Sequence, residues 1–381
     1  MKSDARVLIA GAGVAGLTAA IWLGRHGIRP LVIERASRIR ADGFIISLSH
    51  DSYRFARELD LLPRLRELDA RIAASSYHDR TGRALLTLDY QRLFGGVELI
   101  QVMRDDLQTA LHEAARDVAD FRFDSAVDQI EETDDATLVR FRDGTTEVFD
   151  AVIGADGVHS TVRRAAFSED DIQRHWLGLN CAAYSVDGDV GLRAKFETHM
   201  ERDRYLVIYA SGNGRSAAVF VWESDSRDVP PKEQRFDAIR AQFQDPPAMV
   251  QRVFDVGPPK GSVYFDALQQ IEMPRWHRGR VCLLGDAAHC MTLLSGQGAS
   301  SAFAGASYLG KALIAMEPTD AFQSYEAAMR PMISEVQPMA RRSASWYVPR
   351  SPWRQMVRDS AMRWLPESYF YRHFQSKYSK A

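Results

Sequence analysis

Residues 6–34, "RVLIAGAGVAGLTAAIWLGRHGIRPLVIE", decide the fold. Residues 6–10 are an apolar run typical of a buried strand, and residues 17–26 have the apolar content of a helix. Between them Gly11, Gly13 and Gly16 form G-x-G-x-x-G, and a second apolar run ends at Glu34. This order of strand, glycine turn, helix, strand and acid predicts a dinucleotide-binding βαβ unit.

Each position of this fingerprint has its own physical purpose. Gly11 lets the chain turn, Gly13 lets the backbone approach a pyrophosphate, and Gly16 lets helix and strand pack closely. The free N–H groups and positive dipole end of the helix attract phosphate, and Glu34 can accept hydrogen bonds from ribose hydroxyls. The fingerprint does not separate FAD from NAD. The candidate contacts in this unit are Gly11, Gly13, Ala15, Gly16, Glu34 and Arg35.

Composition limits the classes of protein that remain. The 381 residues are 46% apolar and 26% charged, which suits a globular chain large enough for two packed domains. A net charge of -2 gives no electrostatic reason to bind nucleic acid, and no stretch approaches the roughly 20 apolar residues of a membrane span. Three cysteines at unrelated spacings form neither a disulfide framework nor a metal site, so we expect a cytoplasmic protein without a metal.

Three later segments bear on the choice of dinucleotide. Arg104 stands at the start of a predicted helix, where it could also be a solvated charge. In "FDAVIGADGVHSTVRR", residues 149–164, a strand leads into the Asp156-Gly157 turn and then into a helix that carries Arg164. In "VCLLGDAAH", residues 281–289, a strand ends at Gly285-Asp286.

Together with the fingerprint, these segments resemble the flavoprotein monooxygenases of the para-hydroxybenzoate hydroxylase type, the single-component FAD-dependent aromatic hydroxylases. That family includes polyketide-tailoring and tetracycline-modifying branches. The resemblance covers roughly residues 5–345, because the motifs occur in the family's order and at comparable spacing. It implies FAD as cofactor, with Asp286 on the ribityl chain, Arg104 on the phosphate and ribityl region, and Glu34 on the adenosine ribose. It implies that Asp156, Gly157 and Arg164 serve FAD and the pyridine nucleotide.

A glycine pair follows the third segment. Gly296 and Gly298 precede a predicted helix that begins near Ala299 and whose small and apolar residues repeat at helical spacing. The positive end of this helix would stabilise negative charge on the N1 and C2 carbonyl edge of a flavin without reorganising. A tightly packed helix with small residues toward the sheet explains the same pattern, and both interpretations hold together.

One loop departs from the family pattern. The family commonly has prolines between the histidine and the glycine pair, whereas this chain has Thr292 and Leu293 there. The resemblance gives His289 a loop-shaping role, and we name no catalytic side chain. Two alternatives therefore stay open: an FAD oxidoreductase of the same fold that inserts no oxygen, and a non-catalytic flavin-fold protein that shields an intermediate.

The resemblance also implies a reaction. NADPH or NADH docks transiently and reduces FAD, molecular oxygen adds at the flavin C4a position, and the hydroperoxide hydroxylates a small aromatic, polyketide or tetracycline-like substrate. The protein supplies a dry pocket and orients the substrate. We expect a monomer or homodimer.

The expected fold is mixed α/β. A Rossmann-like FAD-binding domain with an inserted β-meander comprises residues 1–74, 103–174 and 269–345, and the meander turns near Asp134-Asp135 and Asp143-Gly144. A substrate domain on a mostly antiparallel sheet comprises residues 75–102 and 175–268. The basic, aromatic tail at residues 346–381 is expected to be helical and to lie on the FAD domain, with a membrane-surface or partner-binding role as the alternative.

Overall fold

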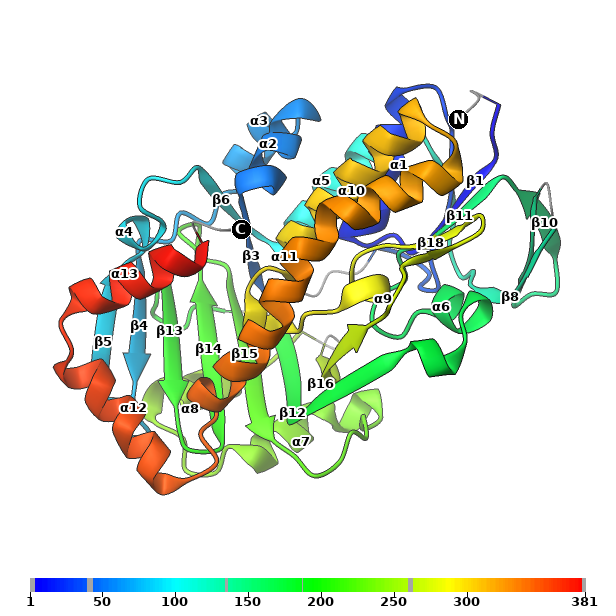
Figure 1. Ribbon diagram of the computed structural model, residues 1–381. Helices are drawn as coiled ribbons and strands as arrows, with labels where there is room; N and C mark the ends of the chain where they lie inside the picture. Colours follow the sequence, from blue (N-terminus) through cyan, green and yellow to red (C-terminus); the bar gives the residue numbers. More distant parts are fainter. Residues whose placement is uncertain (1–3, 40–43, 134–135, 187, 260–262, 379–381) are drawn as a thin grey trace.

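The computed structural model describes residues 4–39, 44–133, 136–186, 188–259 and 263–378 (Figure 1). Two sheets dominate it, and the long helix α11 (Pro318–Tyr347) runs from one to the other. The predicted mixed α/β class is confirmed.

The first sheet is built around the strand of the glycine fingerprint. Its order is β17-β18-β11-β1-β2-β7, and all neighbours are parallel except β17 and β18. Every residue of β1 is buried, which explains why its sequence is a continuous apolar run without alternation. The strands are β1 (Val7–Ala10), β2 (Leu31–Ile33), β7 (Asp120–Arg122), β11 (Ala151–Gly154), β17 (His277–Arg278) and β18 (Val281–Leu283).

Helices with small residues at their contacts pack beside this sheet. α1 (Val14–Arg25) packs against both α5 (Arg104–Ala115) and α10 (Gly298–Ala315), and α10 packs against α11. A Cβ atom at Gly310 would lie 2.5 Å from the Cβ atom of Trp22, so the close approach of α1 and α10 requires a glycine there. The short helices α2 (His50–Glu58) and α3 (Leu62–Glu67) extend this layer.

The predicted meander forms a small antiparallel sheet of order β10-β9-β8. Gly144 turns the chain between the last two strands with a φ of +87°. The other predicted turn, Asp134-Asp135, lies outside the described residues. Helix α6 (Thr161–Ala166) packs against β8, and the strands are β8 (Val127–Glu132), β9 (Thr137–Phe141) and β10 (Thr146–Phe149).

The second large sheet has the order β16-β12-β15-β14-β13-β4-β5. It is antiparallel except where β13 runs parallel to β4. One face packs against α7 (Arg235–Gln242) and α8 (Ala248–Val256) in a core rich in aromatic rings. The strands are β4 (Ala74–His78), β5 (Ala84–Asp89), β12 (Gln173–Val186), β13 (Lys195–Met200), β14 (Arg204–Ala210), β15 (Ser216–Glu223) and β16 (Tyr264–Glu272).

Shorter elements connect the two large sheets. β3 (Ile45–Ser49) pairs with β6 (Leu99–Met103), so the end of the predicted 75–102 segment pairs with a strand of the first segment. The domain boundaries themselves stay a prediction. The remaining short elements are α4 (Tyr90–Phe94), α9 (Asp286–His289), η1 (Glu169–Asp171), η2 (Lys232–Gln234) and η3 (Leu293–Ser295).

The tail forms two helices, α12 (Pro352–Trp364) and α13 (Glu367–Tyr378). Both pack against β5, and α13 also packs against α4, so the expectation that the tail lies on the FAD domain is wrong. Met362, Phe370 and Tyr371 are buried in the apolar core on the other face of the large sheet. The guanidinium of Arg358 is buried and donates to the carbonyls of Glu201 and Tyr347, both at 3.0 Å. The tail is therefore held by the apolar core at the β5 end of the large sheet.

Candidate cofactor and active site

A groove with a cavity of about 180 Å³ opens where β1, β2 and β11 end. The carboxyl ends of parallel strands share one sheet edge, so segments far apart in the chain meet there. Eight of the predicted site residues line the groove: Gly11, Gly13, Glu34, Arg35, Arg104, Asp156, Gly157 and Asp286.

The three fingerprint glycines have different surroundings. A Cβ at Gly11, where φ is +107°, would lie 2.4 Å from the carbonyl oxygen of Ala155, and one at Gly16 would lie 1.9 Å from the carbonyl oxygen of Gly11. A Cβ at Gly13 would meet no atom of the described residues within 4 Å. Gly11 and Gly16 are therefore required by the packing of the protein itself. Gly13 leaves open space beside the start of α1, as a bound pyrophosphate requires.

Glu34 is held at the end of β2 by the backbone. Its carboxylate accepts hydrogen bonds from the N–H groups of Ala12 and Ala36, both at 3.0 Å. Gln108, which the sequence did not single out, donates from Nε2 to the carbonyl of Ala12 at 2.7 Å and also lines the groove. The acid and the glycine turn are thus fixed relative to each other, and Arg35 lies exposed beside them.

Arg104 and Asp286 supply opposite charges to the groove. Asp286 begins α9 and its side chain is accessible from the groove, while protein surrounds it on the other sides. This desolvation raises the pKa of the Asp286 carboxyl, and the Arg104 charge and a contact with Cys290 oppose the rise. The Arg104 side chain makes no hydrogen bond or ion pair with another described residue, so its donors remain available to a ligand.

Asp156 lines the groove but also caps α6. Its carboxylate accepts from the hydroxyl of Ser160, from the backbone N–H of Thr161 at 2.6 Å and from the Thr161 hydroxyl at 2.8 Å. Such bonds satisfy the free donors of a helix start. Arg164 lies outside the groove, exposed, where it donates to the carbonyl of His159 at 2.9 Å.

The neighbouring arginine, Arg163, is the one that the structure buries. It donates to the carbonyl of Ala287 at 2.8 Å and to that of Val158 at 2.6 Å, and so joins α9 to the loop before α6. Burial, aided by the Arg174 charge, lowers the pKa of Arg163 to about 10. The sequence prediction named Arg164 of this helix, whereas the structure turns Arg163 inward and leaves Arg164 exposed.

A second polar group in the groove had no sequence motif to indicate it. The Asp266 carboxylate on β16 lies 2.9 Å from Nε2 of His159 and accepts from the Tyr264 hydroxyl at 3.2 Å. His159 and Asp266 are 107 positions apart, so only the fold brings them together. They close the end of the groove that faces the large sheet.

The residues around the predicted flavin-edge helix pack closely. Gly285 has a φ of +63°, and a Cβ there would lie 3.3 Å from Ala15 and 3.5 Å from Ala302, between α1 and α10. Gly296 has a φ of +67°, and α10 begins at Gly298, where an added Cβ would meet nothing within 4 Å. The start of α10 therefore faces open space, and Ala299 lies in its first turn, partly buried against the core.

The loop that lacks the family's prolines has an unusual backbone. Thr292 has a φ of +69° and a ψ of 161°, a region that side chains other than glycine's rarely adopt. A proline ring fixes φ near −65°, so this conformation excludes proline. The Thr292 hydroxyl is buried without a partner among the described residues. Leu293 and Leu294 follow and pack against the apolar face of the large sheet.

His289 lies behind this loop, away from the groove. Burial, aided by the Arg330 charge, lowers the pKa of His289 to about 4; its Nε2 lies 3.2 Å from the Tyr325 hydroxyl, and its ring lies 4.5 Å from Trp276. It borders a separate polar cavity of about 350 Å³ between β16 and α11. His289 is thus a neutral and tightly packed side chain, as expected for a residue that shapes the loop.

Comparisons with known proteins agree with this geometry. The FAD binding domain family matches residues 4–338. A flavin-dependent monooxygenase of Legionella longbeachae is 30% identical over 340 residues, which cover 87% of each chain. The tetracycline destructase Tet(51) has a TM-score of 0.81 at 25% identity, covering 98% of each chain. HpxO of Klebsiella pneumoniae, solved with FAD and uric acid, has a TM-score of 0.84 at 23% identity over 98% of this chain and 96% of its own, and shows the shared fold.

The groove fits the dinucleotide that this family binds, because it combines open backbone at Gly13, the Arg104 cation, which no described residue pairs, and a fixed acid at Glu34. The chain belongs to the FAD-binding family of flavin-dependent monooxygenases, of the para-hydroxybenzoate hydroxylase type.

Proposed function

We propose that this enzyme uses FAD, NAD(P)H and molecular oxygen to hydroxylate a small, neutral aromatic or polyketide-like substrate held between the FAD groove and the large sheet. The observation that carries the proposal is the convergence of Gly13, Arg104 and Asp286 on one groove. Gly285, next to Asp286, lies close to Ala302 of α10. FAD, when bound, supplies the redox chemistry and activates oxygen. The chain's own residues bind it, orient it and exclude water.

The binding roles follow from the positions of the residues. Gly11, Gly13, Ala15 and Gly16 would shape the pyrophosphate turn, with Arg104 as its counter-charge, and Glu34 and Arg35 would hold the adenosine end. Asp286, presented by Gly285, would accept from ribityl hydroxyls. Asp156 and Gly157 would shape the wall of the groove through the α6 cap, and Arg164 would serve only a ligand that reaches its outer rim.

The start of α10 would support the redox step. Gly296, Gly298 and Ala299 present a helix end whose first N–H groups lack partners within the helix. This positive dipole end stabilises negative charge that develops on a flavin edge, without having to reorganise.

The substrate wall supports a neutral, aromatic ligand. Leu293 and Leu294 pack against the same apolar cluster of the large sheet as Phe196, Val207 and Tyr209. Apolar and aromatic side chains favour flat, apolar ligands. The tetracycline destructase and the urate-bound HpxO are similar proteins whose ligands have fused rings.

We further propose that the enzyme works in a reducing compartment such as the cytoplasm, as a monomer or homodimer. Its three cysteines are buried and free, which supports this location. No helix of the described residues is long and apolar enough to cross a membrane.

The test is turnover with a substrate panel. Purified protein is reconstituted with FAD, and NADPH and NADH oxidation is followed with phenols, quinolones and tetracyclines. We expect a ligand that accelerates NAD(P)H oxidation and yields a product heavier by one oxygen atom. Accelerated oxidation with an unaltered ligand or a product without added oxygen would instead indicate an FAD oxidoreductase. Absence of FAD binding would refute the proposal.

A further inference from the structure

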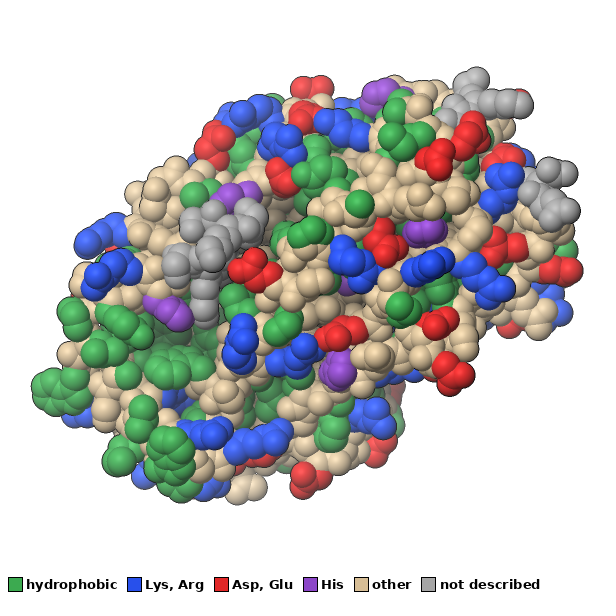
Figure 2. All heavy atoms as spheres, in the orientation of Figure 1, with side chains coloured by type: hydrophobic (Ala, Val, Ile, Leu, Met, Phe, Trp, Pro, Cys, Tyr) green, Lys and Arg blue, Asp and Glu red, His purple; other side chains and the backbone are tan. Residues whose placement is uncertain are grey.

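The outer face of the tail helices carries a group of exposed apolar side chains, here called the tail patch. Trp364 is 79% exposed, Met356 64% and Trp353 60%. Val357, Leu365 and Tyr369 complete the patch. Residues 353, 357 and 364 recur at helical spacing and so share one side of α12. Figure 2 shows large hydrophobic side chains gathered over α12 and α13 at the lower left of the molecule.

The inner face of these helices already has its partners. Met362, Phe370 and Tyr371 are buried in the core of the large sheet, and Arg358 is fixed by two carbonyls. The Tyr371 hydroxyl accepts from the backbone N–H of Asp89 at 2.9 Å. The orientation of α12 and α13 is therefore set by contacts that leave the tail patch outward. A contiguous exposed apolar group on a well-packed element marks an interaction surface.

The charged residues of the tail itself are mostly positive, although Arg350 pairs with Glu223 and Arg363 with Asp79. Residues 346–381 contain seven Lys and Arg residues against two carboxylates. Of the two carboxylates, Asp359 pairs with the buried Arg358 at 2.8 Å. Arg354 and Arg372 are exposed and pair with no carboxylate among the described residues. An apolar helix side flanked by free cations therefore faces solvent.

This charge pattern distinguishes between partners. A two-fold interface would place the tail patch against its own copy, so the cations on one protomer would meet the same cations on the other. Like charges facing each other across an interface oppose association. A surface of anionic lipid complements the same cations, and tryptophan prefers the boundary between headgroups and acyl chains.

We propose that the tail patch docks the enzyme on an anionic lipid surface, with α12 in the plane of the interface and Trp353 and Trp364 inserted beside the headgroups. This inference goes beyond the oxygenase function and does not depend on it. It assigns a role to the exposed aromatic residues that neither the FAD groove nor the core of the large sheet uses.

Vesicle sedimentation of the FAD-loaded full chain tests the proposal. The probes are vesicles of phosphatidylcholine alone and vesicles with about 30% phosphatidylglycerol, at about 0.1 M salt. We expect binding to the anionic vesicles to be at least about tenfold stronger, with a blue shift of tryptophan fluorescence. The double variant Trp353→Ser/Trp364→Ser should lose at least about tenfold in binding, and Arg354→Gln/Arg372→Gln should lose the preference for anionic lipid.

Controls separate this result from misfolding and from other surfaces. Val148→Ser removes a 45% exposed apolar side chain on β10, at the other end of the molecule, and should leave vesicle binding unchanged. FAD absorbance and basal NAD(P)H oxidation should be the same in all variants. Failure of the wild-type protein to bind anionic vesicles at about 1 mM lipid would overturn the proposal. A wild-type dimer that the double tryptophan variant converts to a monomer would overturn it too, because the patch would then join two copies.

Discussion

Gly13 and Gly16 belong to one motif but serve different partners. The backbone around Gly16 leaves no room for a side chain, whereas the space beside Gly13 is empty within the protein. One glycine is thus needed for the fold and the other for a ligand. This difference gives a direct test of whether the groove binds a dinucleotide.

We predict that Gly13→Ala keeps the free energy of unfolding of the FAD-free protein within about 1 kcal/mol, because the new methyl group meets no described residue within 4 Å. FAD binding should weaken by about tenfold or more, since the methyl group would lie where the phosphates approach. Gly16→Ala should instead lower the free energy of unfolding by about 3 kcal/mol. Calorimetry measures the free energy of unfolding, and titration with FAD measures the affinity. An alanine at position 13 that binds FAD normally would contradict the assignment of the groove.

Thr292 is the residue where the chain leaves the family pattern. We predict that Thr292→Pro, although it restores a family residue, lowers the free energy of unfolding by about 3 kcal/mol, because proline cannot adopt a φ of +69°. Thr292→Ser is the matched control and should change it by less than about 1 kcal/mol. Chemical denaturation measures both variants. A proline variant as stable as the wild type would mean that the loop does not need this backbone conformation.

Much of the site was readable at the residue scale. Gly11 and Glu34 follow from the spacing of the glycine fingerprint, and the family resemblance adds Arg104 and Asp286; all four line the groove. Arg163 was not predicted as a contact, because a helix that is six residues long has too little periodicity to indicate which arginine is buried. Asp266 was missed because nothing in the sequence of β16 shows which polar residue will meet a side chain from a distant segment of the chain.

At the scale of elements, Arg163 joins two segments that each contribute to the groove. It links the loop after β11, which carries Asp156, to α9, which carries Asp286. Both bonds are made to carbonyl groups, and no described residue forms an ion pair with Arg163, although the Asp156 charge acts on it from nearby. Burial removes the Arg163 guanidinium from water, as its lowered pKa indicates, and this desolvation costs free energy. The two hydrogen bonds must therefore be well formed to hold the charged group in place.

We predict that Arg163→Met destabilises the protein by about 2 kcal/mol, because two buried carbonyls lose their donor. FAD affinity should fall as well, since Asp286 is no longer held against α6. Arg164→Met, its exposed neighbour, should change stability by no more than about 0.5 kcal/mol. Thermal unfolding with and without FAD measures these effects. An Arg163→Met protein with wild-type stability and affinity would show that the link is dispensable.

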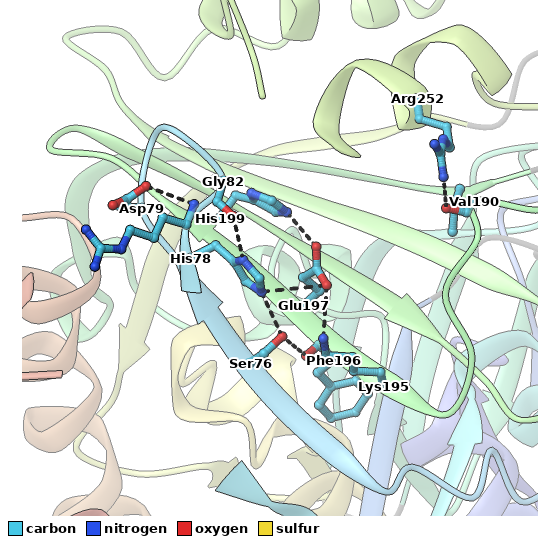
Figure 3. A network of polar contacts seen from close by, with 11 residues as sticks. Ser76, His78, Asp79, Gly82, Val190, Lys195, Phe196, Glu197, His199 and Arg252 are labelled. Atoms are coloured by element: carbon cyan, nitrogen blue, oxygen red, sulfur yellow. Dashed lines mark hydrogen bonds and ion pairs between the residues drawn. The ribbon is translucent and has the colours of Figure 1, made fainter. Parts of the chain in front are cut away.

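Strands β4 and β13 share a second buried polar network, outside the groove (Figure 3). The Glu197 carboxylate lies 2.9 Å from Nε2 of His199, 3.2 Å from Nζ of Lys195 and 3.7 Å from Nε2 of His78. Burial alone would raise the pKa of Glu197, but the His199 hydrogen bond and the His78 and His199 charges outweigh it. The pKa falls from 4.5 to about 2.

A carboxylate whose pKa is lowered by folding stabilises the folded state above its unfolded value and loses that contribution as the pH falls. We predict that Glu197→Gln costs about 2 kcal/mol at pH 7 and that the difference from wild type shrinks as the pH falls from 4.5 toward about 2. The control is Glu131→Gln, on the exposed surface of β8, which should leave the free energy of unfolding unchanged. Urea unfolding across this pH range measures the stability difference between the variant and the wild type. If this difference did not change with pH, the loss of stability would come from packing and not from the charge of the carboxylate.

At the scale of the whole molecule, the sequence predicted the components better than their arrangement. The parallel unit, the meander and the large antiparallel sheet each follow from local apolar periods. The tail was assigned to the FAD domain because composition gives only that it is basic, aromatic and helical. Its actual position depends on the buried end of the large sheet around β5, which involves residues hundreds of positions away.

The arrangement places an FAD groove beside β16 of the large sheet, and Leu293 and Leu294 of the strained loop pack against the apolar face of that sheet. Each part alone is consistent with other flavoproteins, and only the product of turnover shows that oxygen is inserted. The most direct measurement is turnover under ¹⁸O₂ with NAD(P)H and a ligand that stimulates its oxidation. We predict a product that carries one ¹⁸O atom, with the other appearing in water. A product without ¹⁸O, formed while NAD(P)H is consumed, would contradict the assignment as a monooxygenase.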